Sequence, residues 1–446
     1  MGSMQAAPLL GAGGDRPWWP WRRRGLWRNG AFLTLWAGQT VSEFGSRVTG
    51  VALPLVAVLL LGATPQQMGL LSGLQYLPVA LASLVAGVWV DRLRRRPLLI
   101  ATNLIMAAII GTVPLAAAAG QLRIEQLYVV GPLMGLCGVV FGLAYAAYFR
   151  SLVSRHELLE GNTKLRLTSS AAAVAGPGVG GALVQLASAP LALLIDSLSY
   201  LVAAVSVWLI RVPEALPLPA SRRSGLWREM AEGLRLVWCQ PMLRHLGLGG
   251  AAWNLFGGAS AALWPLYVTR ELGLSPAVFG ALAIAGSLGG LLGALMGERL
   301  ARRIGVGPIL VWSSLLMLAG GVLAPLAGVA AAHLGSGTAA ALAVPGAMML
   351  AAEALAGISL AVYVVNYSSL RQAITPQHLQ GRVNGSMQVM YAAPVPLGAF
   401  AGGTIAQHLG TLSTLWLVAL GFTVVCAGLL RSPLRRLRDV PAPIEE

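Results

Sequence analysis

The stretch Gly87-Val-Trp-Val-Asp91-Arg92-Leu-Arg94-Arg95-Arg96-Pro97-Leu-Leu99 decides the fold that we expect for this chain. An apolar run ends in one carboxylate and a cluster of arginines, and Pro97 then opens a second apolar run of about twenty residues, which is long enough to cross a bilayer. The stretch therefore predicts two spanning helices joined by a short basic turn. Because the arginines already make the turn soluble, we expect Asp91 to accept hydrogen bonds from arginine side chains and from a helix N-terminus, as a latch between moving parts.

The composition indicates an integral membrane protein. Of the 446 residues, 56% are hydrophobic and 11% are charged, whereas soluble domains carry about a quarter charged residues; the mean hydropathy is +0.72. The net charge of +15 comes from arginines in short groups between apolar runs, so it predicts membrane topology and not nucleic-acid binding. The three cysteines and five histidines show no disulfide or metal-ligand spacing, and we expect no metal and no cofactor.

Twelve apolar runs are long enough to span a membrane. They predict an all-α membrane protein with six spanning helices in residues 30–210 and six in residues 243–431, separated by a linker in 211–242 and flanked by tails in 1–29 and 432–446. Within the linker, apolar residues recur at helical spacing over Leu226–Trp238, which predicts an amphipathic helix on the membrane surface. The expected helices cover about 30–61, 68–90, 98–119, 127–149, 167–188, 191–210, 245–268, 276–300, 308–330, 340–369, 383–407 and 412–430.

The arginines also predict the orientation of the chain. They gather at the termini and in every second turn, whereas the opposite turns hold only Arg123 and Arg270, each beside an acid. Basic residues favour the cytoplasmic side, so both termini are expected in the cytoplasm. The near absence of lysine, with heavy use of Arg, Ala and Gly, points to a GC-rich bacterial genome and hence to a bacterial inner membrane.

The quoted stretch resembles the loop between helices 2 and 3 of major facilitator superfamily transporters, which has the pattern Gly-x-x-x-Asp-Arg-x-Gly-Arg-Arg. Gly87, Asp91, Arg92, Arg95 and Arg96 match it, and Arg94 stands where the family usually has glycine. The resemblance implies two six-helix bundles that alternate in access, with the substrate site near the midplane between them.

The second half of the chain repeats features of the first. Glu298-Arg299 ends the eighth apolar run as Asp91-Arg92 ends the second. Arg371 and Arg382 flank a further turn on the basic side, so we interpret them as gate latches to helix ends. The predicted conformational latch therefore comprises Gly87, Asp91, Arg92, Arg95, Arg96, Glu298, Arg299, Arg371 and Arg382.

Two further motifs narrow the resemblance. Gly176-Pro177-Gly-Val-Gly180-Gly181 resembles the core of the antiporter signature of the superfamily, in which small residues let helices approach closely and the proline bends the helix. The stretch from Leu370 to Arg382 resembles the bacterial drug exporters that include macrolide efflux proteins and the enterobactin exporter. Both resemblances imply export, of drugs or of a siderophore-like product.

Three charged residues within the apolar runs are candidates for chemistry, because charges in the hydrocarbon region are costly. Glu43 lies about 18 Å from the start of the first helix, near the midplane, and Arg47 lies one turn away on the same face. The two form either a self-neutralised structural pair or a site for a proton or a cationic substrate. Glu353 has no basic neighbour in sequence, and a carboxyl group that is costly to keep charged suits proton coupling. Glu43 and Glu353 are thus the predicted proton-coupling residues.

The resemblance also implies which residues meet the substrate. In the superfamily, helices 1, 4, 7 and 10 line the central cavity. The predicted substrate cavity therefore comprises Glu43, Arg47, Tyr145, Tyr148, Trp253, Asn254, Trp264 and Glu353.

These features predict a proton-coupled exporter of amphipathic small molecules, working as a monomer in the bilayer by alternating access. Alternatives are a proton-coupled nutrient importer and a non-transporting receptor or scaffold with a transporter fold. A membrane-embedded enzyme is not expected, because neither a serine-centred elbow nor a phosphate-binding loop is present in the sequence.

Overall fold

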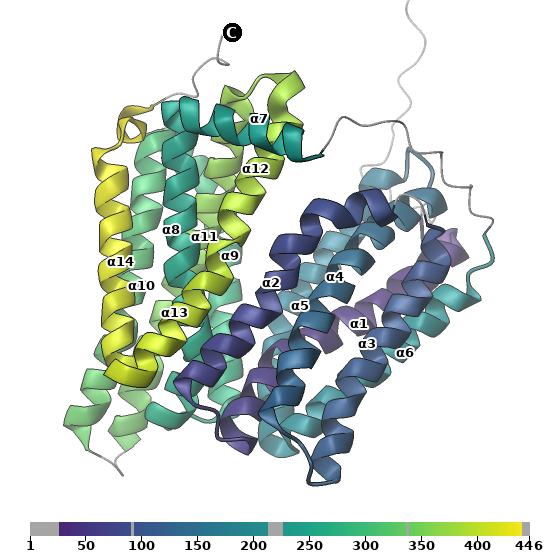
Figure 1. Ribbon diagram of the computed structural model, residues 1–446, viewed down its shortest axis with the longest axis horizontal. Coiled ribbons are helices and arrows are strands. Elements are labelled where there is room, and N and C mark those ends of the chain that lie inside the picture. The colour runs from purple at the N-terminus through teal and green to yellow at the C-terminus, as the bar shows by residue number, and fades with distance from the viewer. Residues whose placement is uncertain (1–25, 91–92, 213–225, 336–338, 439–446) are drawn as a thin grey trace, which may run out of the picture.

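The computed structural model describes residues 26–90, 93–212, 226–335 and 339–438 (Figure 1), and within these residues all regular structure is helical. Ten helices there are long and apolar enough to cross a membrane, if α1 with its π-helical end and α12 with α13 each count as one. The predicted all-helical membrane fold is thereby confirmed. Asp91 and Arg92 of the predicted latch lie outside the described residues.

The helices fall into two groups on either side of the molecule (Figure 1). The N-terminal helices are α1 (Gly30–Leu55) with the π-helix η2 (Val56–Leu60), α2 (Pro65–Val90), α3 (Arg95–Ala118), α4 (Ile124–Leu152), α5 (Leu158–Leu186) and α6 (Ala189–Leu209). The C-terminal helices are α8 (Pro241–Leu266) with the π-helix η3 (Tyr267–Glu271), α9 (Pro276–Ile304), α10 (Val306–Leu334), α11 (Ala339–Ile374), α12 (Gln380–Ala392), α13 (Pro394–Leu409) and α14 (Thr411–Arg431). Between them in sequence lies α7 (Leu226–Cys239), at the place of the predicted amphipathic helix.

Local sequence explains where several helices begin. Because the bilayer core offers no water, backbone groups there must bond within the protein, which favours helices. The free N–H groups of the first turn are bonded by side chains that precede the helix. Asn29 accepts from the Phe32 N–H at 3.0 Å, Ser188 from the Leu191 N–H at 3.3 Å, and Ser275 from the Val278 N–H at 3.4 Å.

Two predicted boundaries were wrong. The charged segment 150–166 was expected to connect two helices, but α5 already begins at Leu158. Its first turns are stabilised by the Glu160–Lys164 ion pair, at 2.6 Å and helical spacing. The eleventh run, expected as one helix over 383–407, is divided into α12 and α13, because Pro394 has no N–H to continue the hydrogen-bond pattern.

The two groups of helices meet at one end of the molecule. We name the end that carries α7 the α7 face and the opposite end the far face. α8 starts directly after α7 and is about 39 Å long at 1.5 Å per residue, so η3 lies at the far face. In Figure 1 the ribbons of the two groups converge towards the far face and diverge towards the α7 face.

Glycines make the contacts between the groups close. Where α2 meets α13, a Cβ atom on Gly69 would lie 2.7 Å from the Gly403 Cα. Where α5 meets α9, a Cβ atom on Gly280 would lie 3.1 Å from the Gly181 Cα. No larger residue fits these two crossings without moving the backbone. We name them the glycine crossings.

We predict that Gly69→Ala destabilises the protein by about 1–3 kcal/mol, the usual result of overpacking. The added methyl group would lie 2.6 Å from the Ala399 carbonyl oxygen, so α2 and α13 must separate. The measurement is the apparent Tm of the detergent-purified protein. Gly138→Ala in α4, which meets nothing within 4 Å, is the control. Equal Tm values for the two variants would contradict the prediction.

Candidate functional site

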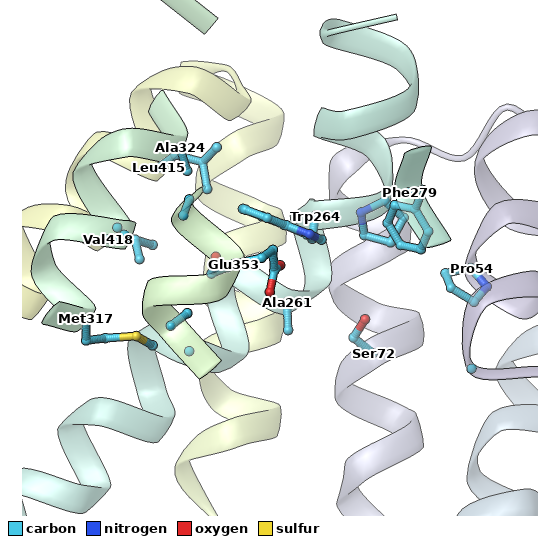
Figure 2. Close-up of a pocket in the computed structure, with 18 of the residues that line it drawn as sticks. Pro54, Ser72, Ala261, Trp264, Phe279, Met317, Ala324, Glu353, Leu415 and Val418 are labelled. Atoms are coloured by element: carbon cyan, nitrogen blue, oxygen red, sulfur yellow. The ribbon is translucent and has the colours of Figure 1, made fainter. Parts of the chain in front are cut away.

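A cavity of about 410 Å³ lies between the two groups of helices, and we name it the central cavity. The N-terminal helices line it from α1 and α2, and the C-terminal helices from α8, α9, α10, α11 and α14. Figure 2 shows Pro54 and Ser72 on one side of the cavity and Trp264, Glu353 and Met317 on the other. Most of the lining is apolar or aromatic, which suits an amphipathic small molecule.

Glu353 of α11 is the only charged side chain among the described residues that line the central cavity. Figure 2 shows Glu353 on the same side of the cavity as Trp264 and Ala261 of α8. Gly286 of α9 leaves the room for it, since a Cβ atom there would lie 3.0 Å from Oε2. Within the described chain, this carboxyl group has no hydrogen-bond or ion-pair partner. A charge in such a place is costly, and binding a proton or a cationic ligand removes the cost.

A second cavity, also of about 410 Å³, lies within the N-terminal helices between α1, α4 and α5, and we name it the side cavity. It contains Glu43 and Tyr145 of the predicted substrate residues, together with Asn162 and Arg166. The Tyr145 hydroxyl is buried and has no hydrogen-bond partner in the described part of the chain. The structure therefore puts Glu43 and Glu353 in two different cavities.

Glu43 is paired, in contrast to Glu353. Its Oε1 atom accepts from Arg47 Nη2 at 2.8 Å and from the Ser169 hydroxyl at 3.3 Å. Arg47 in turn packs its Cβ against Gly176 of α5. The pair is partly exposed, with 26% of the Glu43 side chain accessible, so a molecule in the side cavity can still reach it.

The remaining predicted cavity residues line neither cavity. Tyr148 is buried among the N-terminal helices. Trp253 stacks on Tyr363, with ring centroids 5.0 Å apart, within the C-terminal helices. The Asn254 amide donates to the Gly250 carbonyl of its own helix at 2.9 Å.

A third acid, Asp196 of α6, is fully buried but has two hydrogen-bond donors. The Thr49 hydroxyl of α1 donates to it at 2.5 Å and the Ser199 hydroxyl at 2.9 Å. Gly45 allows α1 to approach, because a Cβ atom there would collide with Asp196 and Ser199. Asp196 therefore ties α1 to α6.

The described residues of the predicted latch lie on the α7 face. Arg96 donates to the last carbonyls of α6, those of Val207 and Trp208, at 3.3 and 2.6 Å. Arg382 pairs with Glu232 of α7 at 3.0 Å, and Glu298 pairs with Arg302 of its own helix at 2.8 Å. The other members are placed by element: Gly87 in α2, Arg95 at the start of α3, Arg299 near the end of α9, and Arg371 near the end of α11, stacked on Tyr367.

The Gly176–Gly181 motif of α5 packs against two neighbouring helices, α1 and α9. Gly176 and Gly180 face α1, at Arg47 and Val48. Pro177 and Gly181 face Gly280 of α9, where they form one of the glycine crossings. The motif therefore joins α5 both to its own group and to the other group.

Sequence reasoning missed several residues of the central cavity. α2 contributes Ser72, Gln75 and Tyr76, and α1 contributes Thr49. Ser72 and Gln75 are polar, lie three residues apart in an apolar helix and so share one face. This pair of polar residues on one face of an apolar helix was the sequence signal that α2 lines the cavity.

Comparison with known proteins decides the family. The model of the transmembrane secretion effectors, a family of the major facilitator superfamily, matches residues 25–442. The chain belongs to this family.

Relatives are similar over almost the whole chain. The multidrug efflux pump Tap of Mycolicibacterium fortuitum is 26% identical over 426 residues, which cover 93% of this chain and 97% of that protein. Macrolide efflux protein A of Streptococcus pyogenes is 23% identical over 416 residues, which cover 92% and 97%. This family member is therefore a multi-pass membrane transporter and not an enzyme.

Solved structures support the fold alone. The nucleoside transporter NupG matches with a TM-score of 0.68 and 9% identity, covering 90% of this chain and 98% of that one. A bacterial homolog of the human lysosomal transporter Spinster, inward-facing and occupied, matches with a TM-score of 0.65 and 14% identity, covering 93% and 99%. Both are transporters whose helices follow the same course.

We predict that removing the carboxyl group destabilises the protein at Asp196 but not at Glu353. Asp196→Ala removes the acceptor of two buried hydroxyl groups and lowers the stability by about 1–3 kcal/mol. Glu353→Gln removes a carboxyl group without a partner, so the stability changes by less than about 0.5 kcal/mol or rises. The apparent Tm of each purified variant is the measurement, and a larger loss for Glu353→Gln than for Asp196→Ala would contradict this assignment.

Proposed function

We propose that this transporter exports amphipathic small molecules, such as drugs, in exchange for protons. The observation that carries the proposal is the position of Glu353, an acid without a partner in an otherwise uncharged cavity between the two groups of helices. A side chain that takes up a proton when the substrate leaves must be accessible to the proton and to the substrate. The relatives named as multidrug and macrolide efflux proteins support the direction and the class of substrate.

The proposed topology has twelve crossings in two six-helix halves, residues 30–210 and 243–431, joined by the linker 211–242. In this topology α2 and α8, each 26 residues long, also cross the membrane, in addition to the ten helices that are apolar enough to do so. We assign the α7 face to the cytoplasm of a bacterial cell, with both termini, because basic residues gather at the helix ends there: Arg96 at the start of α3, and Arg302 and Arg303 in the last turn of α9. With the far face on the outer side, we assign this arrangement of the helices to an inward-facing state of a monomer.

In the proposed cycle, the substrate enters from the cytoplasm or the inner leaflet and binds against Trp264 and Phe279, with a polar or cationic group near Glu353. The far face then opens while the latch residues join the two halves on the cytoplasmic side. A proton from outside binds to the Glu353 carboxylate, which removes its attraction for the substrate. After the return to the inward-facing state, the carboxyl group releases the proton to the cytoplasm.

Glu43 remains a second candidate for proton coupling. Its ion pair with Arg47 and its hydrogen bond from Ser169 already compensate its charge. A substrate cation in the side cavity competes with Arg47 for it. We therefore expect variants of Glu43 to alter substrate affinity more than the dependence of transport on protons.

We predict that Glu353→Gln lowers proton-driven transport at least about tenfold, because an amide cannot exchange the proton. The measurement is the accumulation of radiolabelled erythromycin or of ethidium in inverted membrane vesicles energised with a proton gradient. Glu353→Asp keeps the carboxyl group and is expected to retain part of the activity. The control is Glu125→Gln, which should keep full activity. Glu125 is an exposed acid in the first turn of α4, on the far face.

Three outcomes would reject parts of the proposal. Accumulation that ignores a protonophore would exclude proton coupling. Uptake of substrate by intact cells, instead of extrusion, would favour an importer. No accumulation of any tested compound by the wild-type protein, together with no effect of Glu353→Gln, would favour a receptor or scaffold.

A further inference from the structure

A charged side chain joins the two groups of helices at the far face. Arg270 belongs to η3, at the end of α8 in the C-terminal group. Its guanidinium donates from Nη2 to the Val58 carbonyl at 2.9 Å and from Nη1 to the Ala63 carbonyl at 3.0 Å. Both acceptors follow α1 in the N-terminal group, so one side chain spans the junction.

Both carbonyls lie where α1–η2 ends: Val58 is among the last four residues of the helix, and Ala63 lies in the turn that follows it. The last four carbonyls of a helix lack partners within it and carry the negative end of the helix dipole. η2 ends at Leu60, and Gly62, with φ +64°, turns the chain out of the helix. Arg270 therefore caps the C-terminus of α1–η2 from the other half of the protein.

Among the described residues, no charged side chain of the N-terminal group reaches the end of α8–η3 in return. η3 repeats the geometry of η2: Leu61 N–H donates to Val56 at 3.1 Å and Leu272 N–H donates to Tyr267 at 2.9 Å, and a glycine at φ +64° follows each turn. Arg270 lies three residues before Gly273, and the residue three positions before Gly62 is Leu59. Leu59 is an exposed apolar residue. The two helix ends therefore share one geometry, but only the C-terminal one carries a cation at this position.

The helix turn that carries Arg270 is anchored to the C-terminal helices by a buried hydrogen bond. The buried Tyr267 hydroxyl, three residues before Arg270, donates to the Ala324 carbonyl of α10 at 2.7 Å. Two neutral hydrogen bonds also join the groups, from the Ala277 N–H to Gln185 at 3.1 Å and from the Ser287 hydroxyl to the Ala173 carbonyl at 2.7 Å. The Arg270 bonds differ from these because their donor is charged, and such bonds are stronger than neutral ones.

We propose that Arg270 is the gate residue of the far face: its two bonds hold that face closed and must break whenever the cavity opens to that side. This inference rests on the alternating access proposed above. The guanidinium suits the task because its planar donors reach two carbonyls at once, whereas a lysine ammonium is a point charge on a flexible stem.

The test measures how often the far face opens. In a chain with Cys137, Cys239 and Cys426 replaced by serine, Ser72→Cys places a thiol in the central cavity. A membrane-impermeant thiol reagent is added to intact cells. We expect Arg270→Ala to raise the rate of labelling about tenfold and Arg270→Lys to raise it less, because loss of a closing interaction shifts the population towards the open state.

Arg123→Ala is the matched control, since Arg123 is the other arginine on the far face and is exposed at the start of α4. Its labelling rate should equal that of the parent. If Arg270→Ala does not yield a monodisperse protein, the Arg270→Lys rate decides, and a rate equal to the parent overturns the proposal.

A second measurement does not depend on membrane orientation. Spin labels at Leu60→Cys and Leu409→Cys, both exposed and on opposite sides of the junction, should show a longer distance more often in Arg270→Ala. Unchanged distances and labelling, in a protein that still accumulates substrate in vesicles, would overturn the gate and leave the proposed function intact. Wild-type protein without proton-driven accumulation would instead reject the proposed function.

Discussion

The close backbone contact at the glycine crossings is the constraint on which the rest of this structure depends. In a bilayer, apolar side chains gain little by leaving the lipid, so helices associate through tight packing and hydrogen bonds. Gly69 with Gly403, and Gly181 with Gly280, allow that packing at the far face. The two groups of helices are thereby joined near one end, and the central cavity lies where they begin to diverge.

Three acids within the spanning helices, Glu43, Asp196 and Glu353, differ in their partners among the described residues. Asp196 is bonded by two hydroxyl groups and joins two helices, and Glu43 is paired with Arg47. Glu353 has neither kind of partner in the described chain and lines the central cavity. A charge that is compensated stabilises the fold, whereas one that is left uncompensated is available to a proton or a ligand.

Much of the fold follows from the sequence because its signals are local. Apolar length predicts spanning helices, and apolar spacing predicts α7 within one residue of its observed end. The cavity was harder to predict because it depends on which side of a helix faces inward. Tyr145 and Tyr148 lie three residues apart, yet one lines the side cavity and the other is packed in the interior. The Thr49–Asp196 hydrogen bond joins residues 147 positions apart, so no local sequence pattern predicts it.

The bend between α12 and α13 separates two sets of contacts within one crossing. α12 packs mainly on α7 and α8, with a smaller contact to α2, whereas α13 packs mainly on α8 and α2. Because Pro394 interrupts the hydrogen-bond pattern, a small change in dihedral angles there tilts one segment relative to the other. α12 can thus tilt on the α7 face while Gly403 of α13 stays against Gly69 of α2. The packing of α12 on α7 and the glycine crossing of α13 are therefore mechanically separable parts of one helical run.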